Sequence, residues 1–163
     1  MSLSVVLAGA LAVAFGLSGA ALAQSASAEQ FPRFGSFKSA ETFMREGPSA
    51  SSRIKWVYHH KGLPVEVLAQ YDVWRRVRDS DGEIGWVHAA MLSKERTALV
   101  TGTGYASMRA EEKYQSDVVA EVQPGAIGEL RSCTHLACKV TFGDTTGWVD
   151  RSRLYGIYVA ETF

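Results

Sequence analysis

The chain has 163 residues, with 17 basic and 17 acidic side chains and a formal net charge of zero at neutral pH. Because no strong net field would attract a polyanion, the composition argues against a nucleic-acid-binding protein. Seven Phe, six Tyr and four Trp supply aromatic surface for two small cores. This length suits two small domains better than one minimal domain.

The N-terminal part differs in composition from the rest, because the first charged side chain is Glu29. An apolar run is followed by the small-residue site Ala21-Leu22-Ala23, which is the layout of a secretory signal peptide. We predict a signal peptide at 1–23, a flexible leader at 24–37, and a location in the periplasm or outside the cell. The alternative is an uncleaved membrane anchor, since the apolar run is just long enough to span a bilayer.

Short apolar segments separated by turn residues fill the first half of the remaining chain. The segments that we expect to be extended are 41–45, 54–58, 63–69, 74–78 and 84–88. Residues 79–82 end in Asp81-Gly82, a pair that supplies the positive φ of a hairpin turn. No segment after the signal keeps a helical period for more than about a turn. This pattern predicts an all-β fold of small barrels.

The second half repeats the first at matched spacings, which indicates a tandem duplication. Gly85-Trp86-Val87 matches Gly147-Trp148-Val149, and each Trp precedes a Leu by six residues. Other matched pairs are Met44-Arg45 with Met108-Arg109, Gly62 with Gly125, Glu66 with Glu129, and Val77 with Val140. We therefore predict one domain at 38–95 and a second at 96–163.

The order of these motifs resembles the bacterial SH3-like (SH3b) family, and in particular its exported two-repeat branch. The features that carry the resemblance are Arg45, Gly62, the strand Trp74 to Val77, and Gly85-Trp86-Val87. The resemblance implies two tandem SH3-like barrels after an N-terminal signal helix. It also implies a role in binding cell-wall peptides or protein segments.

The predicted ligand site lies on the first barrel. Val77 must face the core, so Trp74 and Arg76 point to the other side of the strand. An outward indole offers a rigid contact surface of the kind found at binding hot spots. The alternative is that Trp74 packs under the loop at 46–53. The full set of expected ligand-binding residues is Trp74, Trp56, Tyr58, Tyr71 and Arg76.

Other aromatic and imidazole groups are expected to have structural or solvated roles. Trp86 and Trp148 occupy matched places, which favours a shared packing role in the core. His59 and His60 are adjacent, so strand geometry would direct them to opposite faces and away from a common metal ion. Ala137 stands at the place of Trp74 in the second repeat, so we expect that barrel to act as a scaffold.

Cys133 and Cys138 are the only cysteines and flank a short hairpin. An exported chain with an even number of cysteines favours a disulfide. The alternative is a Cys-x-His-x-x-Cys metal site, which would need reduced thiols and a fourth ligand. We predict no metal and no other cofactor.

These features favour a non-catalytic module of the cell envelope that binds cell-wall peptide or a protein segment. The sequence contains no G-x-S-x-G, phosphate-binding glycine loop or H-E-x-x-H motif. The second hypothesis is a periplasmic protein–protein adaptor or a regulatory partner of a cell-wall enzyme. An enzyme is the third, and no nucleophile, base and orienting group can be assembled for it.

Overall fold

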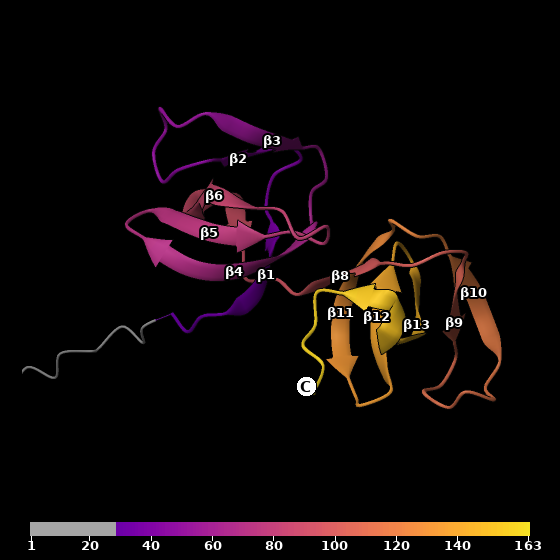
Figure 1. Ribbon diagram of the computed structural model, residues 1–163. Helices are drawn as coiled ribbons and strands as arrows, with labels where there is room; N and C mark the ends of the chain where they lie inside the picture. Colours follow the sequence, from indigo (N-terminus) through magenta and orange to yellow (C-terminus); the bar gives the residue numbers. More distant parts are fainter. Residues whose placement is uncertain (1–28) are drawn as a thin grey trace, which may run out of the picture.

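The computed structural model describes residues 29–163, and Figure 1 shows two small β-barrels side by side. Each barrel is a seven-stranded antiparallel sheet, and no α-helix occurs in the described residues. The predicted signal peptide lies outside them, as does the leader up to residue 28. Within 29–163, no helix has the length and apolarity needed to cross a bilayer. The expected all-β fold of tandem SH3-like barrels is confirmed.

The strand order of the first sheet is β3-β2-β6-β5-β4-β1-β7. Its strands are β1 Arg33–Phe37, β2 Thr42–Arg45, β3 Ile54–Tyr58, β4 Pro64–Tyr71, β5 Trp74–Arg78, β6 Ile84–His88 and β7 Leu92–Ser93. A single 3-10 turn, Ala89–Met91, lies between β6 and β7. The expected segments at 54–58, 74–78 and 84–88 coincide with β3, β5 and β6.

The second sheet has the corresponding order β10-β9-β13-β12-β11-β8-β14. Its strands are β8 Thr97–Val100, β9 Ala106–Arg109, β10 Val118–Val122, β11 Ile127–Cys133, β12 Ala137–Phe142, β13 Thr145–Asp150 and β14 Leu154–Tyr155. The 3-10 turn Arg151–Arg153 repeats the one in the first barrel. The same topology in both sheets is what a duplicated sequence predicts.

The glycine of each Gly-Trp-Val motif packs closely against a methionine of the core. Gly85 and Gly147 are buried, and a Cβ at either place would lie 2.4 Å from the Cγ of Met44 or Met108. Both methionines are fully buried. The motif therefore directs its Gly and Val inward and its Trp outward, because side chains alternate along a strand.

The flexible leader expected at 24–37 is wrong at its C-terminal end. Residues 33–37 form β1, which pairs with β4 and with β7. Phe37 is 1% exposed in the first core, and Phe34 is buried on the other side of the strand. Composition misled the prediction here because small residues such as Gly35 are used for close packing: a Cβ there would meet the Ser93 carbonyl at 2.8 Å.

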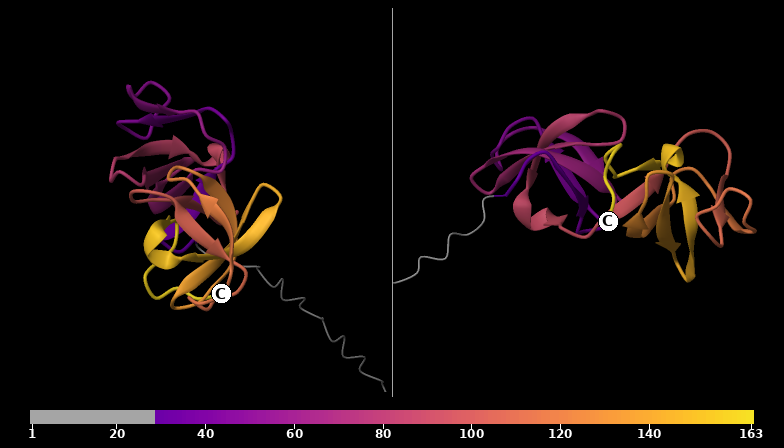
Figure 2. Two further views of the ribbon diagram at one scale, coloured as in Figure 1. Left: turned by 90° about the vertical axis from the view of Figure 1, so that its right-hand side faces the viewer. Right: turned by 90° about the horizontal axis from the view of Figure 1, so that it is seen from below.

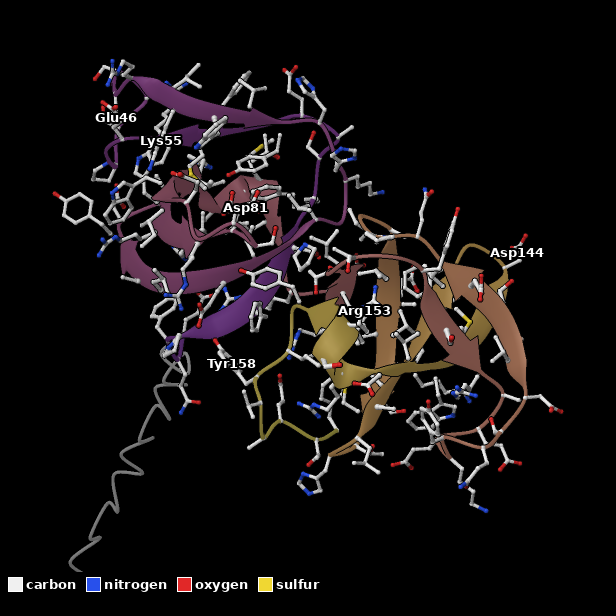
Figure 3. All side chains as sticks on the ribbon, turned by 45° about the vertical axis from the view of Figure 1, so that its right-hand side comes forward. Glu46, Lys55, Asp81, Asp144, Arg153 and Tyr158 are labelled. Atoms are coloured by element: carbon white, nitrogen blue, oxygen red, sulfur yellow. A yellow bond between two sulfur atoms is a disulfide. The ribbon has the colours of Figure 1, made fainter. Side chains whose placement is uncertain are left out.

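An aromatic cluster joins the two barrels. The ring centroid of Phe34 lies 5.4 Å from that of Tyr155 and 4.7 Å from that of Tyr158, both in the C-terminal part of the chain. Figure 3 shows Tyr158 where the two barrels meet, and Figure 2 shows the chain end there too. Hydrogen bonds cross the same junction, from Thr97 Oγ1 to the Gly62 carbonyl at 2.6 Å and from the Tyr155 hydroxyl to the Arg78 carbonyl at 3.0 Å. Burial raises the pKa of both tyrosines, and the nearby Glu66 carboxylate adds to the effect.

A bidentate ion pair fixes the C-terminal segment beside this cluster. Arg96 donates to both carboxylate oxygens of Glu161, at 2.6 and 2.9 Å, and its guanidinium lies 5.8 Å from the Phe34 ring. The hydrogen bond from Arg96 lowers the pKa of Glu161, although partial burial opposes the shift.

We expect Glu161→Gln to lower the free energy of unfolding by about 1 kcal/mol at pH 7. Because the folded pKa lies below the unfolded value of 4.5, the stabilisation is complete above that value and disappears as the pH falls through the folded pKa. Urea unfolding of the wild-type protein and the variant at pH 7 and at pH 3 would measure the loss of free energy and its dependence on pH. A constant difference between the two proteins across that range would contradict the assignment.

Candidate functional site

Two of the predicted site residues lie on the outward face of β5. Val77 is in the core, so Trp74 and Arg76, each an odd number of residues away, point outward. Their partners on the neighbouring strand β6 are His88 and Trp86, respectively. The outward side of the first barrel therefore carries a row of aromatic and basic groups.

Tyr71 completes this surface from the end of β4. Its ring is 63% exposed and lies edge-on to Trp86, with ring centroids 6.5 Å apart. Trp74 is partly buried because its ring packs edge-on against His88, with centroids 5.5 Å apart. We call Tyr71, Trp74, Arg76 and Trp86 the aromatic face.

The other two predicted site residues are not part of the aromatic face. Trp56 pairs with Met44 and Tyr58 with Thr42, and both partners are fully buried, so the two aromatic side chains are on the inward side of the β2–β3 ribbon. The Tyr58 ring lies 5.0 Å from the core ring of Phe37.

Polar neighbours hold these two inward residues in place. The Tyr58 hydroxyl donates to Asp79 at 2.7 Å, and burial together with this carboxylate raises the pKa of Tyr58. Hydrogen bonds from Lys55 and from the Trp56 indole lower the pKa of Glu83. Trp56 and Tyr58 thus connect β3 to the turn between β5 and β6, which carries Asp79 and Glu83.

Trp86 and Trp148 were expected in the cores, and that prediction is wrong. Both are partly exposed and neither belongs to a buried cluster. The alternation rule that placed Trp74 outward gives this result when it is applied to Gly85 and Val87, both of which are buried. Trp86 is thus a surface residue that the sequence could have identified.

An arginine closes the loop after the second strand of each barrel. Arg45 Nη1 donates to the Ser52 carbonyl at 2.7 Å, and Arg109 Nη1 donates to the Ser116 carbonyl at 2.8 Å. The arginines that match between the two halves are therefore loop-positioning residues. The loop of the second barrel differs in composition, because it carries an aromatic ring, Tyr114, and several charges.

A pocket of about 630 Å³ lies on the outward side of the second barrel. Its walls come from β9, β13, the loop at 110–117 and the hairpin at 134–136. Trp148 and Arg109 are registered partners in it, and Ala137 lines it where the first barrel has Trp74. We call this cavity the second-barrel pocket. The sequence-based expectation of a bare scaffold did not foresee it.

The Cys133–Cys138 disulfide forms, and no free cysteine exists in residues 29–163. It joins directly opposed residues of β11 and β12 inside the second core. Engagement of both thiols rules out the alternative Cys-x-His-x-x-Cys metal site. The bond also anchors the short hairpin whose Leu136 and Ala137 line the second-barrel pocket.

Comparison with known protein families finds a match for the first barrel. Residues 38–94 match the family model described as the bacterial SH3 domain. No curated protein sequence matches the chain.

Three solved structures are similar over most of the described chain. NlpC1 from Trichomonas vaginalis is 13% identical with a TM-score of 0.35, over 78% of this chain and 47% of that one. NlpC2 from the same organism is 11% identical with a TM-score of 0.34, over 78% and 49%. An NlpC/P60 family protein from Bacillus cereus is 13% identical with a TM-score of 0.34, over 75% and 55%. The chain thus spans about half the length of these structures, and similarity at this level carries no functional conclusion.

The family match and the barrel topology both indicate an SH3-like fold, and the disulfide is compatible with it. A disulfide and a bacterial SH3 domain together point to an extracytoplasmic protein. The narrower resemblance to an exported two-repeat branch stays a prediction. The similarity to the bacterial SH3 domain is shown for residues 38–94 of the first barrel.

Proposed function

We propose that the protein is a non-catalytic binding module of the cell envelope that recognises cell-wall peptide through the aromatic face of its first barrel. The observation that supports this proposal is the outward row of Tyr71, Trp86 and Trp74 beside Arg76. Aromatic rings with a neighbouring guanidinium are the groups most enriched at binding hot spots. The arginine adds a charge that complements the carboxylates of wall peptides.

Aromatic rings on a rigid sheet suit the recognition of an extended segment. Trp74 is held between its registered neighbours Tyr71 and His88, so little side-chain freedom remains to be lost on binding. Arg76 is exposed and makes no ion pair within the described residues, which leaves its guanidinium available to a ligand.

The experiment is a co-sedimentation assay with purified peptidoglycan. We expect Tyr71→Ala and Trp74→Ala to weaken binding at least tenfold, because each removes a ring from the aromatic face. The matched control is Trp56→Ala, which removes a half-exposed indole that is not part of the aromatic face of the same barrel. Full recovery of the wild-type protein in the supernatant would exclude a wall ligand.

A second candidate function, a periplasmic protein–protein adaptor, is favoured by a separate surface. The outward side of the β2–β3 ribbon exposes large apolar side chains, among them Phe43, Ile54 and Val57. β3 is also an edge strand of its sheet, so its outer backbone groups are open to strand addition. Cross-linking in cells should then return one abundant protein partner instead of wall fragments.

A further inference from the structure

The second-barrel pocket owes its space to one difference between the duplicated barrels. Trp74 pairs with His88 in the first barrel, and Ala137 pairs with Asp150 at the matched place in the second. The Trp74 indole packs against its partner, whereas the Ala137 methyl leaves that volume open above Trp148.

Aromatic rings form the walls of this space. Tyr105, just before β9, and Tyr114, in the loop at 110–117, are 65% and 80% exposed, and Trp148 lines the same pocket. The Tyr114 ring is held by Arg109, whose guanidinium carbon lies 4.7 Å from the ring centroid. Exposed rings that converge on one cavity are typical of ligand sites rather than of a solvated surface.

Charges of both signs line the same pocket. Asp150 uses Oδ1 to accept from the backbone and hydroxyl of Ser152, at 2.8 and 2.7 Å, and its other oxygen has no partner in the described residues. Among residues 29–163, neither Glu112 nor Lys113 belongs to an ion pair. Arg153 is engaged with loop carbonyls, including that of Gly104 at 2.7 Å, and serves to support the wall.

We propose that the second-barrel pocket binds a short peptide that carries both a free amine and a free carboxylate. The amine would pair with Asp150 and Glu112, and the carboxylate with Lys113, while the peptide lies against Trp148. The volume of about 630 Å³ is within the usual range for small-ligand pockets. A neutral glycan could donate hydroxyl groups to the acidic residues, but it would offer no carboxylate to Lys113.

This site is distinct from the aromatic face in the proposed function. The two are on different barrels, and each has its own tryptophan: Trp148 in the pocket, and Trp74 and Trp86 on the aromatic face. Binding at one site can therefore be measured even if the other site binds no ligand.

The test follows the indole N–H signals of the four tryptophans by two-dimensional NMR, with the Trp148 signal assigned from Trp148→Phe. The probes are the stem-peptide fraction and the disaccharide fraction, obtained by digesting purified peptidoglycan with an amidase and a muramidase. We expect the Trp148 signal to shift with the peptide fraction. A shift with the disaccharide fraction alone, or no shift of Trp148 with either fraction, would overturn the proposal. Shifts confined to Trp74 and Trp86 would also overturn it, yet they would support the proposed function.

Variants then test the shape and charge of the pocket. Ala137→Trp restores the side chain that the first barrel carries at this place, and we expect it to weaken peptide binding at least tenfold. Tyr114→Ala should weaken it similarly, and a ring that is 80% exposed can be removed without unfolding the protein. Asp150→Asn keeps the cap on Ser152 while removing the charge, so it should abolish the preference for a free over an acetylated amine. The matched control, Trp74→Ala, should leave the shift of Trp148 unchanged.

Discussion

Replacing Phe34 by alanine is expected to lower the free energy of unfolding by about 3 kcal/mol, the low end of the range for a buried phenylalanine. The ring is 8% exposed and fills the space between Tyr155 and Tyr158. Its removal leaves a cavity at the junction of the barrels, and it also uncovers the Glu66–Arg78 ion pair that lies beside it. Urea denaturation followed by circular dichroism would measure the loss.

The control for this prediction is Val159→Ala in the same C-terminal segment. Val159 is 95% exposed, so its truncation should change the free energy of unfolding by less than about 0.5 kcal/mol. If Phe34→Ala were equally mild, the aromatic cluster would contribute little to the folded state. The barrels would then be joined mainly by the hydrogen bonds of Thr97 and Tyr155.

The second large effect is expected from Gly85→Ala in the Gly-Trp-Val motif. A Cβ at this place would lie 2.4 Å from Met44 Cγ and 2.8 Å from the Arg45 carbonyl oxygen, so both a buried side chain and the backbone would have to move. Overpacking of this kind costs about 3 kcal/mol at the upper end of its usual range. Thermal unfolding would report the change as a lower Tm.

Gly82→Ala provides the comparison, because nothing lies within 4 Å of a Cβ built there. Only the strain of a side chain at φ +86° remains, which costs about 1 kcal/mol. The difference between the two variants separates steric crowding from backbone conformation. Equal losses at Gly82 and Gly85 would mean that the close contact with Met44 relaxes without cost.

Strand positions in this protein followed from local rules. The alternation of apolar residues and the Asp81-Gly82 turn were enough to place β5 and β6 with their observed bounds. The matched halves supported the predicted strand positions, because a strand misplaced in one half would not align with its counterpart in the other half. The same rules fail where the chain departs from regular alternation.

A bulge in β4 is such a departure. Val67 pairs with Val77, but the register then shifts, so that Ala69 pairs with the outward Arg76. Simple alternation along β4 would place Ala69 on the same face as Val67. The second barrel has a register shift at the corresponding place, between Leu130 and Ser132. A bulge depends on the pairing of two strands, and neither strand alone contains the signal.

The site was predicted less completely than the fold. Trp74, Arg76 and Tyr71 share a surface. Alternation along β5 indicated this for Trp74 and Arg76, but Tyr71 is on the neighbouring strand β4. The second-barrel pocket could not be foreseen from the loss of a tryptophan at Ala137, because a missing side chain becomes a cavity only where the surrounding walls stay in place. Those walls depend on contacts distant in sequence, such as that of Arg153 with the carbonyl of Gly104.

The junction around Phe34 has a consequence for how the protein would hold a polymer. Because one aromatic cluster and two hydrogen bonds fix the barrels to each other, the aromatic face and the second-barrel pocket keep a constant separation and orientation. Binding of one site to a polymer with repeated peptides would hold the next peptide at a high effective concentration near the other site. Avidity of this kind would favour intact wall over soluble fragments without any additional contact.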